Sequence, residues 1–441
     1  MRIAVFSDLY PPLFIGGYEL GAAAVVGELC RRGHEVMVLT SHEYYHERAP
    51  GRYTLLQHSR EDRAKLVDVG LCLFGYLPRF LRLRPLHFLR GVLATRSARR
   101  RYQAALSAFG PEAFFLFNPM GVAAPVIDDC VSHARRAGVP AAAYISDHWL
   151  DEWPACSPIW QLLRRLGKLG GPLGSLLEAI ACRTIGGLGL LPQLRPAPTH
   201  LIYCSEYIRR RASRRWDTVF ARAPVGGAVE AVVPWGLGET VAPPLTPQAL
   251  DGPEPLSLVF AGQLVEHKGL TVLLDALARC RRPHRLDVIG DTRTEYAAHC
   301  QRRVAELGLS ARVRFLGKKH REQVPEMLRG AQVLVLPSQW DEPFSIVVLE
   351  GMRAGLVVVA TDTGGTAEAI DDGLTGALFP RGDDAALATV LDRLDSDRAL
   401  CRRIADGARE RVRKRYTLKR MVDRLLEVVA PAAMGQRRRV A

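Results

Sequence analysis

Hydrophobic residues in this chain gather into short continuous runs, and longer segments of mixed polarity separate one run from the next. The runs in the first half are RIAVFSD, HEVMVLTS, AFFLFNP, PAAAYISD and THLIYCSE, and those in the second half are LSLVFAGQL, HRLDVIGD, RVRFLG, AQVLVLPS and LVVVATD. Apolar strands that alternate with helices are typical of parallel sheets covered by helices on both faces. The pattern predicts an α/β fold with two doubly wound parallel sheets.

A stretch rich in proline and glycine, AVVPWGLGETVAPPLTPQALDGPEP, separates the two sets of runs and has neither a helical nor a strand period. A chain of 441 residues also exceeds what one hydrophobic core usually supports. We therefore predict a first domain of residues 1–240 and a second domain of residues 241–416. The amphipathic helix expected at residues 417–432 would pack back on the first domain, and residues 433–441 would form a basic tail.

The composition, with 48% hydrophobic and 24% charged residues, is that of a soluble globular protein. No apolar run reaches the roughly 18 to 20 residues that a membrane-spanning helix needs. The start, MRIAVFSDLYPP, resembles a strand and a turn more than a leader peptide, so we expect the protein in the cytoplasm. Nine scattered cysteines without a C-x-x-C pair predict neither a disulfide framework nor a zinc site.

The net charge of +14 would attract phosphates, nucleic acid or an anionic membrane surface, although a general preference for arginine explains it equally well. We find no combined aromatic and basic recognition motif, so we expect no nucleic-acid partner. Two stretches rich in leucine and arginine, residues 66–102 and 157–196, fit basic helices on the inner face of the cell membrane. Ordinary crossover helices with arginines facing water are the alternative.

Candidate chemistry centres on residues 340–350, WDEPFSIVVLE. We predict a helix that starts near Asp341 with Pro343 in its first turn, so that Glu342 and Glu350 share one face. The segment follows an apolar strand, where a helix N-terminus favours a phosphate and nearby carboxylates can accept hydrogen bonds from hydroxyls. Alternatively, Glu342 is a plain helix-entry acid and Glu350 faces solvent.

Two further strand-to-helix turns have the same layout. In FAGQLVEHKGL, Gly262 ends a strand, and Lys268 stands at the start of the next helix, where it could neutralise a diphosphate. In ATDTGGTAE, Gly364 and Gly365 lead into an expected helix that carries Glu368. The carboxyl ends of parallel strands meet at one edge of a sheet, so the three turns should converge there.

This ordered set of motifs resembles the GT-B retaining glycosyltransferases of glycosyltransferase family 4, strongly over residues 256–380 and moderately over the first 40 residues. The resemblance implies two Rossmann-like domains that face a central cleft. It also implies retaining transfer of a sugar from a UDP-, GDP- or ADP-sugar to a glycan, a lipid-linked saccharide or a small acceptor. The nucleotide-sugar is then a co-substrate, and neither a cofactor nor a metal is required.

The resemblance assigns site residues by motif. The catalytic group would be Glu342, Lys268, Asp147 and His148. The donor would be bound by Gly16, Gly17, Gly262, Gln263, Lys268, Glu342, Phe344, Ser345, Ile346, Val347, Glu350, Thr363, Gly364 and Gly365.

Two positions depart from the family pattern. Gln263 stands where the family usually has arginine, which removes one cationic contact to the diphosphate. In YISDHWLDEWP, Ser146 and Asp147 align with the family's His-Asp pair, and His148 follows one residue later. These departures motivate one alternative, a nucleotide-sugar-binding protein of this fold without turnover. A second alternative is a nucleotide-sugar epimerase of similar two-domain architecture.

Overall fold

The computed structural model describes residues 1–7, 10–11, 17–40, 65–68, 99–117, 124–148, 197–212, 228–239, 250, 252–320 and 323–430. The chain forms two compact units. The first domain comprises Met1–Cys204, Ile208–Val233 and Val422–Ala441, and the second comprises Ser205–Tyr207 and Pro234–Met421. The main division therefore lies between Val233 and Pro234, a few residues before the boundary expected from the sequence.

The first domain is built on a seven-stranded parallel sheet of order β3-β2-β1-β4-β5-β6-β7. Its strands are β1 (Arg2–Ser7), β2 (Glu35–Thr40), β3 (Lys65–Asp68), β4 (Ala113–Phe117), β5 (Ala141–Ile145), β6 (His200–Tyr203) and β7 (Val229–Val232). Every residue of β4 and β5 is buried, as expected for central strands with helices on both faces. Its helices include α1 (Gly17–Arg31), α4 (Ala124–Ala137) and α8 (Glu206–Ala212), and residues 99–109 are also helical.

The second domain has a six-stranded parallel sheet of order β10-β9-β8-β11-β12-β13. Its strands are β8 (Ser257–Ala261), β9 (Arg285–Ile289), β10 (Val313–Gly317), β11 (Val333–Leu336), β12 (Val357–Thr361) and β13 (Ala377–Phe379). Its helical segments are η4 (Glu266–Lys268), α10 (Leu270–Arg279), α11 (Glu295–Glu306), α12 (Val324–Arg329), α13 (Ile346–Ala354), η6 (Ala367–Ala369), α14 (Asp384–Ser396) and α15 (Arg398–Arg415). The predicted α/β class with doubly wound parallel sheets is confirmed.

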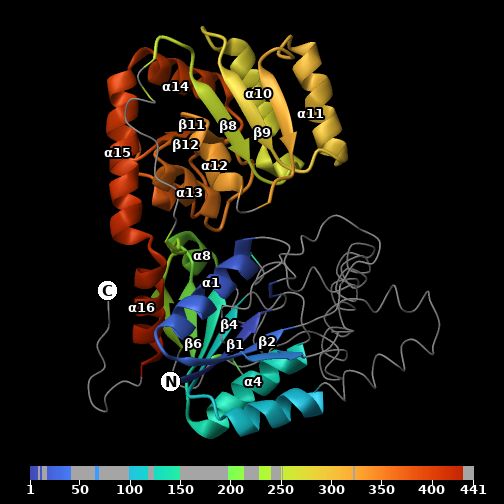
Figure 1. Cartoon of the computed structure of the whole chain (residues 1–441), viewed down its shortest axis with the longest axis vertical. Coiled ribbons are helices and arrows are strands. Elements are labelled where there is room, and N and C mark those ends of the chain that lie inside the picture. The colour runs from blue at the N-terminus through green and yellow to red at the C-terminus, as the bar shows by residue number, and fades with distance from the viewer. Residues whose placement is uncertain are drawn as a thin grey trace, which may run out of the picture. The chain divides into compact units, whose positions relative to one another are not determined.

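Strand order in the second domain reverses direction between β8 and β11, which are neighbours in the sheet. Right-handed crossovers then place the helices that follow these strands on opposite faces. Accordingly α10 packs against α11 and α14, whereas α13 packs against α12 and α15 (Figure 1). Ligands of open α/β sheets bind at such a reversal, outside the carboxyl ends of the strands.

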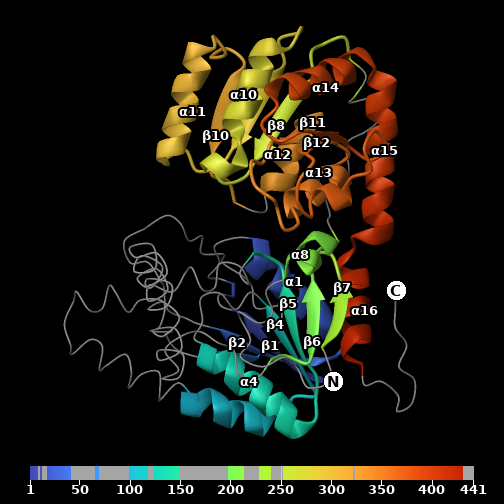
Figure 2. The same ribbon diagram turned by 180° about the vertical axis from the view of Figure 1, so that it is seen from behind.

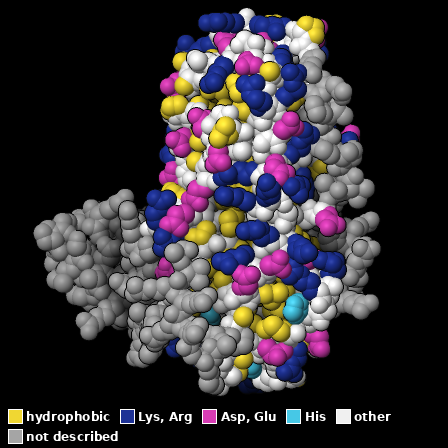
Figure 3. Space-filling view, turned by 90° about the vertical axis from the view of Figure 1, so that its left-hand side faces the viewer, with side chains coloured by type: hydrophobic (Ala, Val, Ile, Leu, Met, Phe, Trp, Pro, Cys, Tyr) yellow, Lys and Arg dark blue, Asp and Glu magenta, His cyan; other side chains and the backbone are white. Residues whose placement is uncertain are grey.

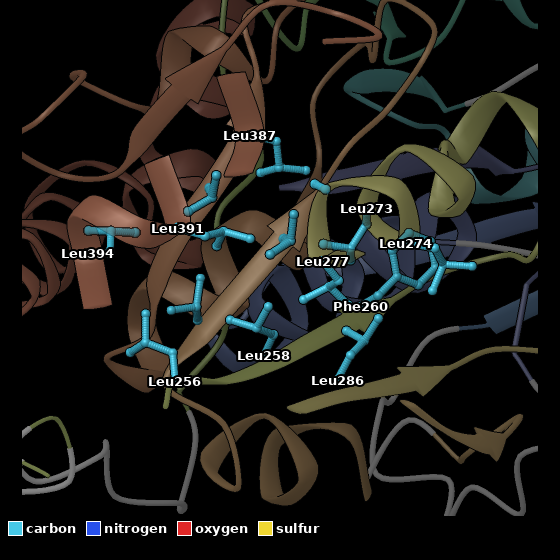
Figure 4. Close-up of a cluster of buried hydrophobic side chains, with 14 of the residues drawn as sticks. Leu256, Leu258, Phe260, Leu273, Leu274, Leu277, Leu286, Leu387, Leu391 and Leu394 are labelled. Carbon is cyan, nitrogen blue, oxygen red and sulfur yellow. The ribbon is translucent and has the colours of Figure 1, made fainter. Parts of the chain in front are cut away.

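The core of the second domain is a dense layer of leucines between the sheet and one helical face. Side chains of β8, β9, α10 and α14 point toward one another in Figure 4. The members labelled there are Leu256, Leu258, Phe260, Leu273, Leu274, Leu277, Leu286, Leu387, Leu391 and Leu394. Each is almost fully buried, so this layer fixes α10 and α14 against the strands that lead to the loops described below.

The last described helix, α16 (Leu418–Val429), belongs to the first domain from Val422 onward. It lies beside β7 in both ribbon views (Figures 1 and 2). Its Asp423 accepts a hydrogen bond from Arg32 at 2.6 Å, just after the end of α1. Apolar residues of one face, among them Val422 and Leu425, are buried.

Basic and acidic side chains are interspersed on the face that carries α15 (Figure 3). Glu410, for example, accepts hydrogen bonds from Arg413 and forms an ion pair with Lys414 at 2.9 Å. Apart from residues 66–68 and 99–102, the two arginine-rich stretches proposed for membrane contact lie outside the described residues, as does the basic tail. Among the described helices, none is long and apolar enough to cross a membrane.

Candidate functional site

Three loops of the second domain, which follow β8, β11 and β12, are joined by backbone hydrogen bonds. The Gln339 N–H donates to the carbonyl of His267 at 2.7 Å, which ties the loop after β11 to the loop after β8. The Gly365 N–H donates to the carbonyl of Glu342 at 2.7 Å, which ties in the loop after β12. The convergence expected from the sequence is therefore present.

Glycines allow these loops to approach one another. Gly269 has φ of 70°, and a Cβ there would fall well inside contact distance of the Pro337 carbonyl oxygen. Gly364 has φ of 60°, and a Cβ on it would collide with the backbone of Glu342. Only glycine combines the left-handed backbone with this closeness of main chains.

An ion pair between a partly buried ammonium and a buried carboxylate lies at the centre of the loops. The Lys268 ammonium lies 2.6 Å from the Glu342 carboxylate, and their side chains are 19% and 7% exposed. The Ser338 hydroxyl donates to the same carboxylate oxygen at 2.8 Å, and the ammonium lies 5.6 Å from the centre of the Trp340 ring. The prediction missed Ser338 and Trp340, since their contacts depend on the path of the loop.

Helix α13 begins at Ile346, so the prediction that it starts near Asp341 is wrong. Glu342 lies on the preceding loop, because its carbonyl bonds to the Gly365 N–H and the Trp340 carbonyl accepts from the Thr363 hydroxyl at 3.3 Å. These contacts take up backbone groups that a helix would need. Glu342 and Glu350 therefore do not share one helical face.

The N-terminus of α13 is not capped by a side chain. Ser345 occupies the N-cap position without accepting a side-chain hydrogen bond, so Ile346 and Val347 begin the helix with N–H groups that lack helical partners. Such a terminus carries partial positive charge and favours an anion. Glu350, on the second turn, is 8% exposed, which rules out the alternative of a solvent-facing residue.

The remaining predicted donor residues line these loops. Gly262 donates its N–H to the Ile289 carbonyl at 3.0 Å, and the side chain of Gln263 is exposed. Phe344 is buried, with its ring centre 5.8 Å from that of Tyr416. The helix expected after Gly365 is present only as η6, a 3-10 turn of three residues that carries Glu368.

Four predicted site residues belong to the first domain: Gly16 and Gly17, expected to bind the donor, and Asp147 and His148, expected to be catalytic. Gly17 begins α1 after β1, whereas Gly16 lies outside the described residues. Asp147 and His148 follow β5 after one residue, Ser146, and the Asp147 carboxylate accepts from the His148 N–H at 2.7 Å. The carboxyl ends of β1 and β5 lie at one edge of the sheet, separated only by β4. Roles for these residues in catalysis remain predictions.

The chemistry available in the second domain is anion binding next to hydrogen-bond acceptors. One ammonium, an open helix N-terminus and close backbone N–H groups would hold a phosphate or diphosphate. The carboxylates of Glu342 and Glu350, on either side of that terminus, would accept hydrogen bonds from hydroxyls. The arrangement fits a ligand with hydroxyl groups at both ends of a diphosphate.

Comparison with known proteins identifies this region. Residues 246–411 match the family model "Glycosyl transferases group 1". The three loops and the Lys268–Glu342 pair all lie inside the matched range.

Curated relatives match over less than half of the chain. D-inositol 3-phosphate glycosyltransferase of Streptomyces bingchenggensis is 31% identical over 196 residues, 42% of this chain and 43% of that protein. Glycogen synthase of Mycobacterium tuberculosis is 30% identical over 187 residues, 42% of this chain and 44% of that protein. The matched stretch thus spans less than half the length of either relative.

Solved structures resemble the whole chain in fold. Alr3699/HepE of Anabaena, solved in complex with UDP, has a TM-score of 0.64 and 17% identity, and the match covers 98% of this chain and all of that chain. Sucrose-phosphate synthase of Thermosynechococcus elongatus has a TM-score of 0.65 and 19% identity over 97% of this chain and 98% of that chain. The predicted GT-B fold with two Rossmann-like domains is confirmed.

Proposed function

We propose that this protein is a retaining glycosyltransferase that moves a sugar from a nucleotide-sugar to a glycan, a lipid-linked saccharide or a small acceptor. The observation that carries the proposal is the Lys268–Glu342 pair beside the uncapped N-terminus of α13, inside the matched family domain. A diphosphate, a ribose and a sugar present the groups that this arrangement is built to bind.

In the proposed reaction, Lys268 and the first N–H groups of α13 bind the diphosphate and stabilise the charge that develops on it as the bond to the sugar breaks. Such preorganised donors act where negative charge appears in the transition state. They supply the electrostatic role that a metal ion fills in other enzymes, so we propose that transfer is metal-independent. Glu342 orients the donor sugar, and Glu350 accepts hydrogen bonds from the ribose.

The new bond forms between the acceptor hydroxyl oxygen and the sugar carbon that the diphosphate leaves. Retention requires attack on the face from which the diphosphate departs, with the acceptor proton passing to the departing phosphate. We propose that Asp147 and His148 orient the acceptor hydroxyl from the first domain. Because Gln263 stands where the family usually has arginine, Lys268 carries more of the cationic charge that the proposed site offers to the diphosphate.

Thermal unfolding against UDP, GDP, ADP and their sugars tests the donor site. A ligand present at about 100 times its dissociation constant adds roughly 2.7 kcal/mol to the stability of the protein. One nucleotide class should raise the melting temperature, and Lys268→Met should reduce that increase. Because HepE was solved with UDP, UDP is the first member of the panel. Identical melts with every nucleotide would contradict a preformed donor site.

Product analysis separates the proposal from its two alternatives. A transferase releases the free nucleoside diphosphate in proportion to glycosylated acceptor, whereas an epimerase converts one nucleotide-sugar into another without any acceptor. A binding protein without turnover shows the thermal shift and neither product. The configuration of the new glycosidic bond, determined by NMR, tests retention. Inversion at the sugar carbon would overturn the proposal that the enzyme is retaining.

We also propose a cytoplasmic location with peripheral attachment to the inner face of the cell membrane, from the net charge of +14 and the two leucine- and arginine-rich stretches. Flotation with vesicles containing anionic lipid at low salt measures this attachment. Protein that floats with anionic vesicles and not with neutral ones supports it, and protein that stays at the bottom in both cases rejects it.

A further inference from the structure

Cys280, His284 and Asp392 come together in the second domain, away from the loops of the proposed donor site. One ligand atom from each, a thiol sulfur, an imidazole nitrogen and a carboxylate oxygen, lies within 4.8 Å of the other two. Cys280 follows α10, His284 immediately precedes β9, and Asp392 lies on α14. His284 stands at the amino end of its strand, so the cluster lies at the opposite edge of the sheet from the donor loops.

The side chain of His284 is fully buried, and neither ring nitrogen has a hydrogen-bond partner. Buried polar groups in folded proteins nearly always have a hydrogen-bond partner, so a buried group without one calls for an explanation, such as an ion that would bind to it. A neutral imidazole keeps the lone pair with which histidine binds a metal. One nitrogen of His284 belongs to the set of close ligand atoms with the thiol and the carboxylate.

We propose that Cys280, His284 and Asp392 bind one zinc-type divalent transition-metal ion that joins the end of α10 to α14. Thiolate, imidazole and carboxylate are the ligands that zinc takes in proteins, with water in the fourth position. A tetrahedral ion with bonds of about 2.0 to 2.3 Å holds its ligand atoms roughly 3.4 to 3.7 Å apart. Side-chain rotations that move the three ligand atoms by about 1 Å are therefore enough to bring them to metal-binding distances.

Metal binding displaces the thiol proton. Burial, reinforced by the nearby Asp392 carboxylate, raises the pKa of the Cys280 thiol to about 12, so the thiol is protonated before an ion arrives. When the sulfur–metal bond forms, that proton leaves to solvent and the thiolate charge partly neutralises the ion. No oxidant or reductant takes part.

Surrounding residues orient the carboxylate and support a structural role. The Arg281 N–H donates to Asp392 at 3.0 Å, and such contacts from outside a metal site fix the direction of a ligand. Leu391 and Leu394 of the same helix pack into the leucine layer of Figure 4. An ion here would link the segment between α10 and β9 to that layer. The sequence prediction of no zinc site rested on the absence of closely spaced cysteine pairs, whereas these ligands come from separate segments.

The test uses the full chain, freed of metal by a chelator and titrated with Zn²⁺ or Co²⁺ alone. The variants are Cys280→Ser and Asp392→Asn, which nearly preserve side-chain size, and the control is Cys30→Ser, at a partly buried cysteine of the first domain. Circular dichroism of each variant establishes that it is folded.

We expect wild type and Cys30→Ser to bind one Zn²⁺ per chain and to melt at a higher temperature when loaded. Cys280→Ser and Asp392→Asn should bind Zn²⁺ at least about tenfold more weakly, since even residues that only orient a metal ligand change affinity by this much. Co²⁺ should produce a thiolate charge-transfer band in wild type that is missing in Cys280→Ser. Equal Zn²⁺ affinity in wild type and Cys280→Ser, or no Zn²⁺ uptake by wild type, overturns the proposal. Neither outcome depends on glycosyltransferase activity.

Discussion

Replacing Gly269 with alanine should separate the loops of the candidate site. Gly269 lies between η4 and α10 with φ of 70°, and an added Cβ would collide with the Pro337 carbonyl oxygen and approach the Gln339 amide nitrogen to 2.9 Å. The carbonyl belongs to the main chain, so a side-chain rotation cannot relieve the collision. The loop after β8 must move away from the loop after β11.

Gly308→Ala is the matched control. Gly308 also has a left-handed backbone, with φ of 67°, but a Cβ there meets nothing within 4 Å. Both substitutions share a backbone penalty of roughly 1–2 kcal/mol. Gly269→Ala adds a steric penalty of about 1–3 kcal/mol, typical of inserting an atom into a packed region. The difference between the two variants therefore isolates the contact between the loops.

Thermal unfolding of both variants measures this difference. In a domain of this size, 1 kcal/mol corresponds to roughly 2–4 °C, so a steric penalty near 2 kcal/mol places Gly269→Ala about 4–8 °C below Gly308→Ala. Gly269→Ala should also lose the stabilisation by nucleotide that Gly308→Ala keeps. If the two variants melt together, the loops are not in contact at Pro337 and the geometry argued for the site is wrong.

Three further predictions follow from described residues. Lys268→Met should weaken UDP binding about tenfold or more, as expected for a lost charge-assisted hydrogen bond. Glu342→Gln removes the carboxylate that competes for Lys268, so it should not weaken UDP binding. If calorimetry finds weaker UDP binding in both variants, the role of Lys268 in binding the diphosphate is contradicted. Leu391→Ala, at a fully buried position, should destabilise by about 2–5 kcal/mol, and Leu374→Ala, at a position 68% exposed, should leave the urea midpoint unchanged. Burial lowers the pKa of His200 from its ordinary 6.5, so below pH 6.5 the unfolded chain binds more protons than the folded protein, and stability decreases as the pH is lowered. The melting temperature of His200→Gln should decrease less steeply over this pH range than that of wild type. The same dependence of melting temperature on pH in both proteins would refute the assignment.

The sequence predicted the central strands because they are apolar on both faces, and it missed three strands that lack this signal. Strand β3 has charged residues at both ends, β7 is a partly exposed edge strand, and β13 has only three residues. Period and hydrophobicity report burial, so they detect the middle of a doubly wound sheet better than its edges.

The site was predicted as a set of loops and not as a set of contacts. Glycine and helix-entry signals located each loop, since they reflect local backbone requirements. The pairing of Lys268 with Glu342 joins residues 74 positions apart and depends on hydrogen bonds between loops, which local pattern does not encode. The late start of α13 has the same origin, because tertiary hydrogen bonds override local helix preference over residues 341–345.

The return of α16 to the first domain bears on how the protein is made. Residues from Val422 onward belong with a sheet whose first strand is Arg2–Ser7, and Asp423 bonds to Arg32 across 391 positions. During translation the first domain emerges early, yet its α16 is synthesised only after the entire second domain. Until then, the apolar surface that α16 covers stays exposed on the ribosome, and it offers a binding surface to chaperones throughout synthesis of the second domain.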